Sequence, residues 1–435
     1  MRKEHDQAQP VTATQTNLRR LEWFTVALGL LVHSGALFPL FMMGADGHLD
    51  DAERAKLRLL YLPVYALSFA LIAARPKRVL VAIMQNVPML LLLLLPLIST
   101  LWSLSPSLSL RRAVALLLSM GFVFLFATRF TPRQQIIAIA AVLGAAVILS
   151  FVAAFALPGL AFMPDGGELR GIFINKNVLG WVSAILVVVG IAAQHDSVLR
   201  LRHLGVVLIV LGWIGCLLSG SVTSLLMAFV AVVFVQVARL FTRQQGLARL
   251  VSKLGALLVI ALVSITFAAV FGVVLDALGK DATLTGRIQL WTLVDAEIAK
   301  YPLLGHGYGA FWSSGNSSMW QLWETIGWQT PHAHNGYRDL LLSIGAIGLG
   351  LFAVVSVRAI QQSSALFSAG PRDGWLWCFV LIGCVLMMNL AETTIMVQND
   401  LLWILFSTAV LTVSSSYAKL QQPAPRVTRI VFSAT

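Results

Sequence analysis

Two short polar stretches of this chain carry side chains that could take part in a reaction. Residues 285–291 (TGRIQLW) place Arg287 in the first turn of an expected helix, and residues 332–337 (HAHNGY) place two histidines where another helix should begin. An arginine near the positive end of a helix dipole is unfavourable unless an anion docks there, and both arginine and helix N-termini bind phosphate. Trp291 shares the face of Arg287. The two stretches therefore predict an anion site and a candidate base.

His334 is the candidate general base. A helix N-terminus destabilises the imidazolium, so the neutral form, which accepts a proton, is favoured. A base in such a place contributes roughly 10²–10⁴ in rate. Asn335, in the same turn, is expected to fix the imidazole, and His332 is interpreted as a residue that orients an acceptor. Two alternatives stay open: His332 is simply exposed to solvent, or His334 only hydrogen-bonds an anion without taking a proton.

Membrane-spanning helices are the elements that must position these residues. Apolar residues make up 58% of the 435 residues, charged residues only 11%, and the mean hydropathy is +0.83, whereas soluble domains carry about 25% charged residues. Several apolar runs reach the roughly 20 residues that cross a bilayer. We expect an all-α polytopic membrane protein with about twelve spans: 23–43, 58–74, 79–102, 113–128, 136–157, 178–194, 204–218, 222–238, 254–275, 336–357, 375–391 and 400–417.

One long, partly helical loop, residues 276–335, interrupts these spans and holds both candidate stretches. Helix connections are usually about 2–8 residues long, and much longer loops tend to be functional. Five of the twelve tryptophans lie here, suited to an interfacial belt or to stacking on sugar rings. The expected organisation is a tail (1–22), nine spans (23–275), the catalytic loop (276–335), three spans (336–417) and a second tail (418–435).

The distribution of positive charge predicts the orientation. With twelve spans both termini share a side, and 20 of the 31 Lys and Arg residues fall there, which the positive-inside rule assigns to the cytoplasm. Short basic loops beside anionic lipid account for the net charge of +12, so no nucleic-acid partner is expected. Cys216, Cys378 and Cys384 fall within apolar spans without metal-binding spacing, so we expect neither a metal site nor cysteine catalysis.

Four motifs occur in order over residues 80–410. They are GIFINKNVLG at 171–180, LSGSVTS at 218–224, Gly286-Arg287-x-x-x-Trp291, and His334-Asn335 followed by nine intervening residues and then Gly345. On a twelve-span frame this set resembles the O-antigen ligase and Wzy-type polymerase superfamily, and its combination is most similar to exopolysaccharide polymerases of the ExoQ kind. One departure is Val222, where many relatives have Arg or Lys. Val222 removes one possible phosphate contact, so Lys176 becomes more important as a candidate for that contact.

The resemblance implies glycan transfer at the periplasmic face of the bacterial inner membrane. Its donor is an undecaprenyl-diphosphate-linked oligosaccharide, its acceptor is another glycan or the lipid A core, and it uses no metal, cofactor or nucleotide sugar. A flippase and a chain-length regulator of the same pathway are further candidate partners, besides the lipid bilayer. No feature of the sequence decides physically between a polymerase and a ligase, and the resemblance favours a polymerase.

Such a transfer needs cations on the diphosphate leaving group. Arg170 and Arg287 can grip phosphate oxygens in a bidentate manner, Lys176 adds a point charge, and stabilising charge in a dry site is often the largest catalytic contribution. The expected catalytic residues are His334, Arg287 and Arg170. The expected substrate contacts are Lys176, Asn177, Trp291, His332, Asn335, Ser221 and Thr223. Arg170 as a loop anchor and Lys176 as a lipid-facing side chain remain alternatives.

A small-solute transporter is the main rival from another class of function. Transporters carry charged residues within their spans and repeats between their halves. Here the charges lie at span ends, as Arg58, Glu392 and Asp400 do, and the halves show no repeat. A membrane enzyme is therefore favoured over a transporter and over a noncatalytic assembly partner.

Overall fold

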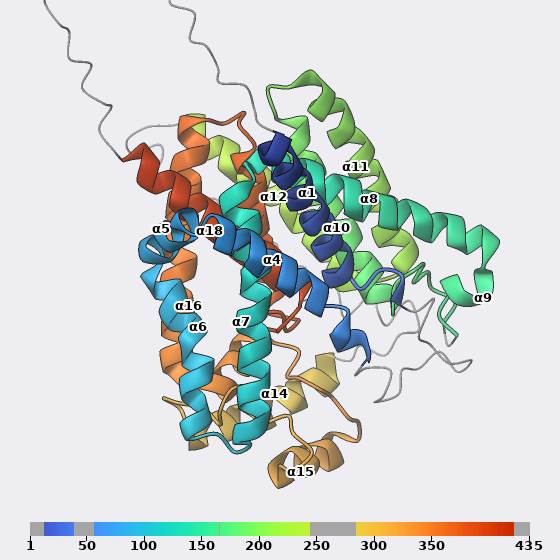
Figure 1. Ribbon diagram of the computed structural model, residues 1–435. Coiled ribbons are helices and arrows are strands. Elements are labelled where there is room, and N and C mark those ends of the chain that lie inside the picture. The colour runs from blue at the N-terminus through green and yellow to red at the C-terminus, as the bar shows by residue number, and fades with distance from the viewer. Residues whose placement is uncertain (1–12, 39–55, 165, 244–283, 422–435) are drawn as a thin grey trace, which may run out of the picture.

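The computed structural model describes residues 13–38, 56–164, 166–243 and 284–421 (Figure 1). Within these residues the chain is helical, and its only β pairing is an isolated bridge between Phe162 and Leu169. The all-α expectation is confirmed. The expected ninth span, 254–275, and the first residues of the long loop lie outside the described residues.

The helices follow most of the expected spans, with shifted ends. They are α1 (Ala13–His33), α4 (Leu62–Ala74), α5 (Lys77–Gln85), α6 (Val87–Ile98), α7 (Pro106–Arg129), α8 (Pro132–Ala156), α9 (Pro158–Ala161), α10 (Lys176–Gln194), α11 (Leu199–Ser219), α12 (Val222–Arg243), α14 (Leu284–Lys300), α15 (Ser317–Ile326), α16 (Gly336–Ala369), α17 (Trp375–Met388) and α18 (Leu401–Leu420). Seven of the described helices are long and apolar enough to cross a membrane, or eight if the bent pair α5 and α6 forms one span. The chain is an integral membrane protein, and the count of twelve spans stays a prediction.

One expected span is broken. The sequence predicts a single span over 79–102, but the chain forms α5 and α6, which meet at Asn86 and are bent by 91°. Pro88 explains the break, because proline has no N–H to donate to the carbonyl of Met84 and its ring clashes with that carbonyl.

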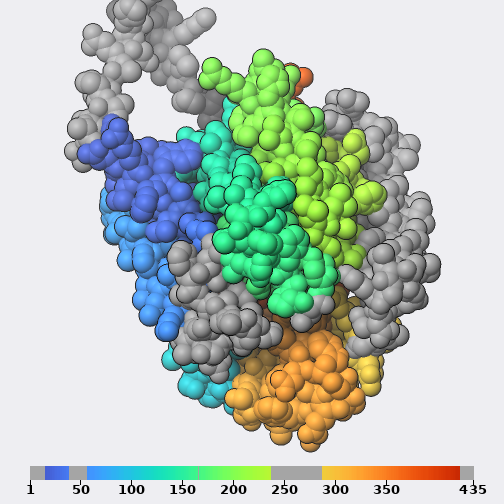
Figure 2. All heavy atoms as spheres, turned by 90° about the vertical axis from the view of Figure 1, so that its right-hand side faces the viewer, coloured from blue at the N-terminus to red at the C-terminus, as the bar shows by residue number. Residues whose placement is uncertain are grey.

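The helices form a bundle with the long loop at one end. α18 packs against α7, α16 and α17, while α10 packs along α11, α12 and α8. α14 and α15 lie at the lower end of Figure 1, whereas α1 begins and α18 ends in its upper part. Figure 2, turned by 90°, shows the long loop in orange as a cap at the same lower end. The assignment of the two ends to the two faces of the membrane stays a prediction.

The described part of the long loop is folded around a small core of its own. The helix expected in this loop is confirmed as α14, which is followed by α15. Apolar side chains from both helices and from the flanking segments form a cluster separate from the main core: Leu290, Val294, Phe311, Met319, Leu322, Ala333 and Leu342. Because Ala333 belongs to this cluster, the core of the loop directly positions the histidine segment.

A break in α16 attaches the loop to the bundle. Ile344 and Gly345 leave helical geometry, with a φ of +65° at Gly345. The N–H of Ala346 donates instead to the carbonyl of Pro302 at 2.8 Å. A Cβ at position 345 would lie 2.1 Å from the carbonyl oxygen of Leu303. Both the left-handed backbone and the close approach of another chain segment therefore require glycine here.

Candidate active site

Asn335 forms the N-cap of α16. Its side-chain oxygen accepts from two N–H groups of the first helical turn, at 3.0 and 3.1 Å. Its amide nitrogen donates to the carbonyl of Leu390 at 3.0 Å, and the residue is 5% exposed. Asn335 therefore fixes the start of the helix rather than the imidazole of His334, which corrects the orienting role expected for it. Its contact with substrate stays a prediction.

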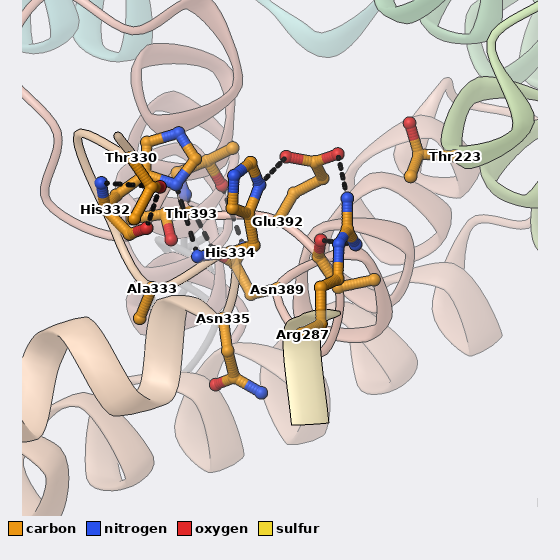
Figure 3. A network of polar contacts seen from close by, with 12 residues as sticks. Thr223, Arg287, Thr330, His332, Ala333, His334, Asn335, Asn389, Glu392 and Thr393 are labelled. Atoms are coloured by element: carbon orange, nitrogen blue, oxygen red, sulfur yellow. Dashed lines mark hydrogen bonds and ion pairs between the residues drawn. The ribbon is translucent and has the colours of Figure 1, made fainter. Parts of the chain in front are cut away.

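His334 is held in a rare backbone conformation. Its φ of +50° lies in the left-handed region, which costs a non-glycine residue on the order of 1–3 kcal/mol and is found mainly at functional sites. The N–H of Ala333 donates to the Asp339 carboxylate at 2.9 Å, and the N–H of His334 donates to Nδ1 of His332 at 3.2 Å. These contacts stabilise the strained segment, and the imidazole of His334 points toward Glu392 (Figure 3).

Glu392 lies between His334 and Arg287. Its buried carboxylate places Oε2 at 3.7 Å from Nδ1 of His334 and Oε1 at 3.9 Å from Nη2 of Arg287 (Figure 3). Nδ1 of His334 is buried and has no hydrogen-bond partner among the described residues. Sequence reasoning placed Glu392 only among the charged residues at span ends. The signal that points to it is an acidic side chain four residues after the end of the apolar helix α17.

Arg287 reaches the site from the first turn of α14. Its Nη1 donates to the carbonyl of Ala391 at 2.8 Å, and 27% of its side chain is exposed. Trp291, one turn later, donates its indole N–H to the carbonyl of Ala333 at 2.9 Å. The guanidinium of Arg338 covers the Trp291 ring at 4.8 Å from its centroid. Trp291 thus holds the histidine segment in place through this hydrogen bond, whereas Arg287 presents an accessible cation beside Glu392.

His332 is a neutral neighbour of His334. The two ring centroids lie 4.2 Å apart. Burial above all, together with the neighbouring His334 and Arg287 and against the effect of Glu392, lowers the pKa of His332 from 6.5 to about 4. Because Nδ1 accepts the N–H of His334, the proton of the neutral ring resides on Nε2. This geometry suits a residue that donates to and orients a ligand, and it argues against simple solvent exposure.

The motifs at 171–180 and 218–224 meet at the N-termini of α10 and α12. The N–H of Leu169 donates to the carbonyl of Leu218 at 3.1 Å, and the indole N–H of Trp181 donates to the Thr223 hydroxyl at 3.4 Å. The same region holds the predicted contacts Asn177, in the first turn of α10, and Ser221, directly before α12. The structure thus brings the four motifs together as two contacting pairs.

Two cations of this region have partners within the protein. Arg170 is 4% exposed, its Nε donates to the carbonyl of Leu160 at 2.8 Å, and burial lowers the pKa of its guanidinium. Lys176 pairs with the carboxylate of Glu168 at 2.6 Å. This geometry favours the loop-anchor interpretation of Arg170. For Lys176, a contact with a diphosphate requires that the substrate replaces Glu168.

Antiparallel packing of α12 and α17 places both motif pairs at the same end of the bundle. Sγ of Cys384, late in α17, contacts the carbonyl of Met227, early in α12, at 3.8 Å. Thr223 therefore lies at the end where α17 leads into Glu392. Figure 3 shows Thr223 beyond Arg287, on the side away from the histidines.

The tryptophans of the long loop mainly hold it together. Besides Trp291, three of them donate their indole N–H within the loop or to α16: Trp312, Trp320 and Trp323. Trp328 differs, because it is 38% exposed and its ring lies 5.9 Å from the ring of His334. Trp328 is thus the loop tryptophan best placed to stack on a sugar ring.

The cysteines are packed among the helices, and Sγ of Cys216 contacts the carbonyls of Gly180 and Ser224. Cys216, Cys378 and Cys384 are free and buried, as the sequence predicts for small apolar side chains. Across the described ranges, no three His, Cys, Asp or Glu side chains gather in a way that could hold a metal ion.

Comparison with known proteins finds similarity over much of the chain. The sequence model of the family described as O-antigen ligase matches residues 207–353, which include the hairpin before α12, the Arg287 motif and the histidine motif. The exopolysaccharide production protein ExoQ of Rhizobium meliloti (strain 1021) is 30% identical over 304 residues, which cover 67% of this chain and 68% of that protein.

Proposed function

Because this chain belongs to the O-antigen ligase family, we propose that it is a membrane glycosyltransferase of the bacterial inner membrane. Its donor is an undecaprenyl-diphosphate-linked oligosaccharide, and its site faces the periplasm. The observation that carries the proposal is the row formed by His334, Glu392 and Arg287, which sets a candidate base and an accessible cation on either side of one buried carboxylate.

The reaction assigned to this row is a substitution at the anomeric carbon of the donor. The acceptor hydroxyl forms the new C–O bond, and the bond between the anomeric carbon and the diphosphate oxygen breaks. The electron pair leaves with undecaprenyl diphosphate, whose developing charge Arg287 stabilises. The hydroxyl proton passes to His334. No other reactant is needed.

Glu392 acts as the positioning residue of His334. A carboxylate at Nδ1 keeps the proton of the neutral ring on that nitrogen, so Nε2 can accept from the substrate. The same carboxylate stabilises the imidazolium formed after transfer. The present 3.7 Å separation becomes a hydrogen bond after a shift of about half an ångström, and such contacts often tighten when substrate binds.

Polymerisation of repeat units is the activity that we favour. The similarity to a protein named for exopolysaccharide production supports a polymerase, whereas the description of the matching family supports transfer to the lipid A core by a ligase. In either case the donor site is the same and only the acceptor differs. A flippase and a chain-length regulator are the proposed pathway partners of a polymerase.

Reconstitution tests this function directly. Purified protein in liposomes receives a defined undecaprenyl-diphosphate-linked repeat unit, and mass spectrometry follows free undecaprenyl diphosphate and glycan length. We expect both to increase together. His334→Ala should reduce the rate by about 10²–10⁴ while donor binding persists. Folded wild-type protein that releases no undecaprenyl diphosphate with either a repeat-unit or a lipid A core acceptor contradicts the proposal.

A further inference from the structure

A cavity with a mixed apolar and polar lining adjoins His332 on the side away from Arg287. It has a volume of about 200 Å³ and is lined by the start of α7, the long loop, α16 and the segment after α17. His332 lines it, whereas His334, Glu392 and Arg287 do not. In Figure 3, His332 and Arg287 flank His334 on opposite sides. The cavity therefore lies next to the candidate base but apart from the cation proposed to hold the diphosphate.

We propose that this cavity binds the acceptor sugar, that is, the single terminal sugar ring whose hydroxyl attacks the donor. The inference rests on the proposed function and names a subsite of the same active centre. Its ligand is an uncharged, hydroxyl-rich sugar ring at the end of a glycan. The glycan can belong to a lipid-linked repeat unit or to the lipid A core, since both present such a ring.

The polar groups of the cavity divide into fixed and available ones. Asp339 is fixed, because its carboxylate accepts from the indole of Trp312 at 2.7 Å, from the hydroxyl of Thr393 at 2.5 Å and from the N–H of Ala333. It therefore organises one wall and contributes no free charge. Since the same carboxylate also holds the histidine segment, the shape of the cavity and the position of His334 depend on one buried group.

The available groups match the hydroxyls of a sugar. Arg112 donates one N–H to the carbonyl of Gly309 at 2.5 Å, and a guanidinium has five N–H groups in total. His332, Ser343 and Gln398 also line the space. The Ser343 hydroxyl oxygen already accepts from the N–H of Gly309 at 3.3 Å, and Oε1 of Gln398 accepts from the hydroxyl of Tyr308 at 3.4 Å. The O–H of Ser343, the amide N–H groups of Gln398 and Nε2–H of His332 remain as donors. The rest of the wall is largely apolar and includes two aromatic rings, Tyr308 and Trp312. A few directed polar groups among aromatic surfaces are typical of small-ligand sites.

The position of the cavity suits an attacking group. In a direct displacement the nucleophile and the leaving group lie on opposite sides of the reacting carbon. The leaving diphosphate is proposed on Arg287, so the hydroxyl must arrive from the side of His332. Because the rings of His332 and His334 lie 4.2 Å apart, a sugar held against His332 brings its hydroxyl within reach of His334.

Binding of a diphosphate-free glycan tests the subsite without relying on turnover. The probes are the repeat-unit oligosaccharide released from the polysaccharide of the producing strain and a core oligosaccharide from lipid A. Binding to the purified full-length protein is measured by calorimetry. Ser343→Met fills the cavity and Gln398→Leu removes an amide at similar volume. Ser314→Met is the matched control, because Ser314 lies in the same loop and is exposed. Thermal unfolding confirms that each variant is folded.

We expect one probe to bind to the wild type, and the preferred probe to identify the acceptor. Ser343→Met should weaken that binding at least about tenfold, which is about 1.4 kcal/mol, and Gln398→Leu should weaken it less. Ser314→Met should bind as the wild type does. Wild-type affinity in folded Ser343→Met, or no binding of either probe to the wild type, overturns the subsite. If the probe binds but no undecaprenyl diphosphate is ever released, the proposed function fails and the sugar site stands.

Discussion

Nδ1 of His334 and Oε2 of Glu392 lie 3.7 Å apart, beside two backbone hydrogen bonds that join their chain segments. The N–H of Gly336 donates to the carbonyls of Asn389 and Glu392, at 2.8 and 2.9 Å. The start of α16 and the segment after α17 are thereby joined beside the two side chains. The fold therefore holds the imidazole and the carboxylate next to each other, so that a small side-chain adjustment brings them into hydrogen-bond contact.

Glu392→Gln should lower the transfer rate by about 10²-fold or more with little effect on donor binding. The amide keeps the shape of the side chain but does not stabilise an imidazolium. In other His–carboxylate pairs, replacing the carboxylate by an amide lowers the rate strongly. Turnover and donor affinity of the purified variant measure this. Glu324→Gln is the control, since Glu324 is exposed on α15. Equal rates for both variants would remove Glu392 from the mechanism.

Arg287→Lys should lose most activity while the protein still inserts. A lysine supplies a point charge and cannot grip a diphosphate with two parallel N–H groups. Transfer rate and membrane yield are compared with those of Arg200→Lys, an exposed arginine at the start of α11. Near-normal turnover in the lysine variant would mean that Arg287 contributes only its positive charge and not a bidentate contact.

Most of the described helices could be predicted from sequence, because apolar length is a local property, whereas the motif residues stay candidates chosen by their spacing. The break at Asn86 was also present in the sequence, as Pro88 follows two residues later. The role of Glu392 could not be predicted, because its contact with His334 depends on how the end of α17 returns to the start of α16. The same holds for the partners of Arg170 and Lys176, which come from a loop whose path has no periodic signal.

Gly345→Ala should destabilise the protein strongly. The new Cβ would meet the Leu303 carbonyl at 2.1 Å, and alanine disfavours a φ of +65°. Gly350→Ala is the matched control on the same helix, because a Cβ added there would meet no heavy atom within 4 Å. Thermal unfolding in detergent should show a lower midpoint for the first variant only. Equal midpoints would mean that the break in α16 is not required.

Acid should destabilise the wild type partly through His332. Its pKa is about 4 in the folded protein and about 6.5 when unfolded. Between about pH 6.5 and pH 4 the unfolded chain therefore binds a proton at His332 that the folded chain does not bind. The free energy of unfolding falls as the pH drops through this range. Over this pH range the unfolding midpoint should fall further in the wild type than in His332→Gln, and the difference should be about 2 °C or more. His203→Gln, which removes an exposed histidine, should behave as the wild type does.

The long loop should face the periplasm and the C-terminal end of α18 the cytoplasm. The basic residues favour this orientation, since 20 of 31 fall on the side of the termini when twelve spans are counted. A cysteine at Ser314 should react with a membrane-impermeant thiol reagent in intact spheroplasts, and one at Gln421 only after the membrane is permeabilised. The native cysteines are buried, so background labelling should be low. The reverse pattern would place His334 and Arg287 in the cytoplasm, away from a donor presented at the outer face, and would contradict both the orientation and the proposed reaction.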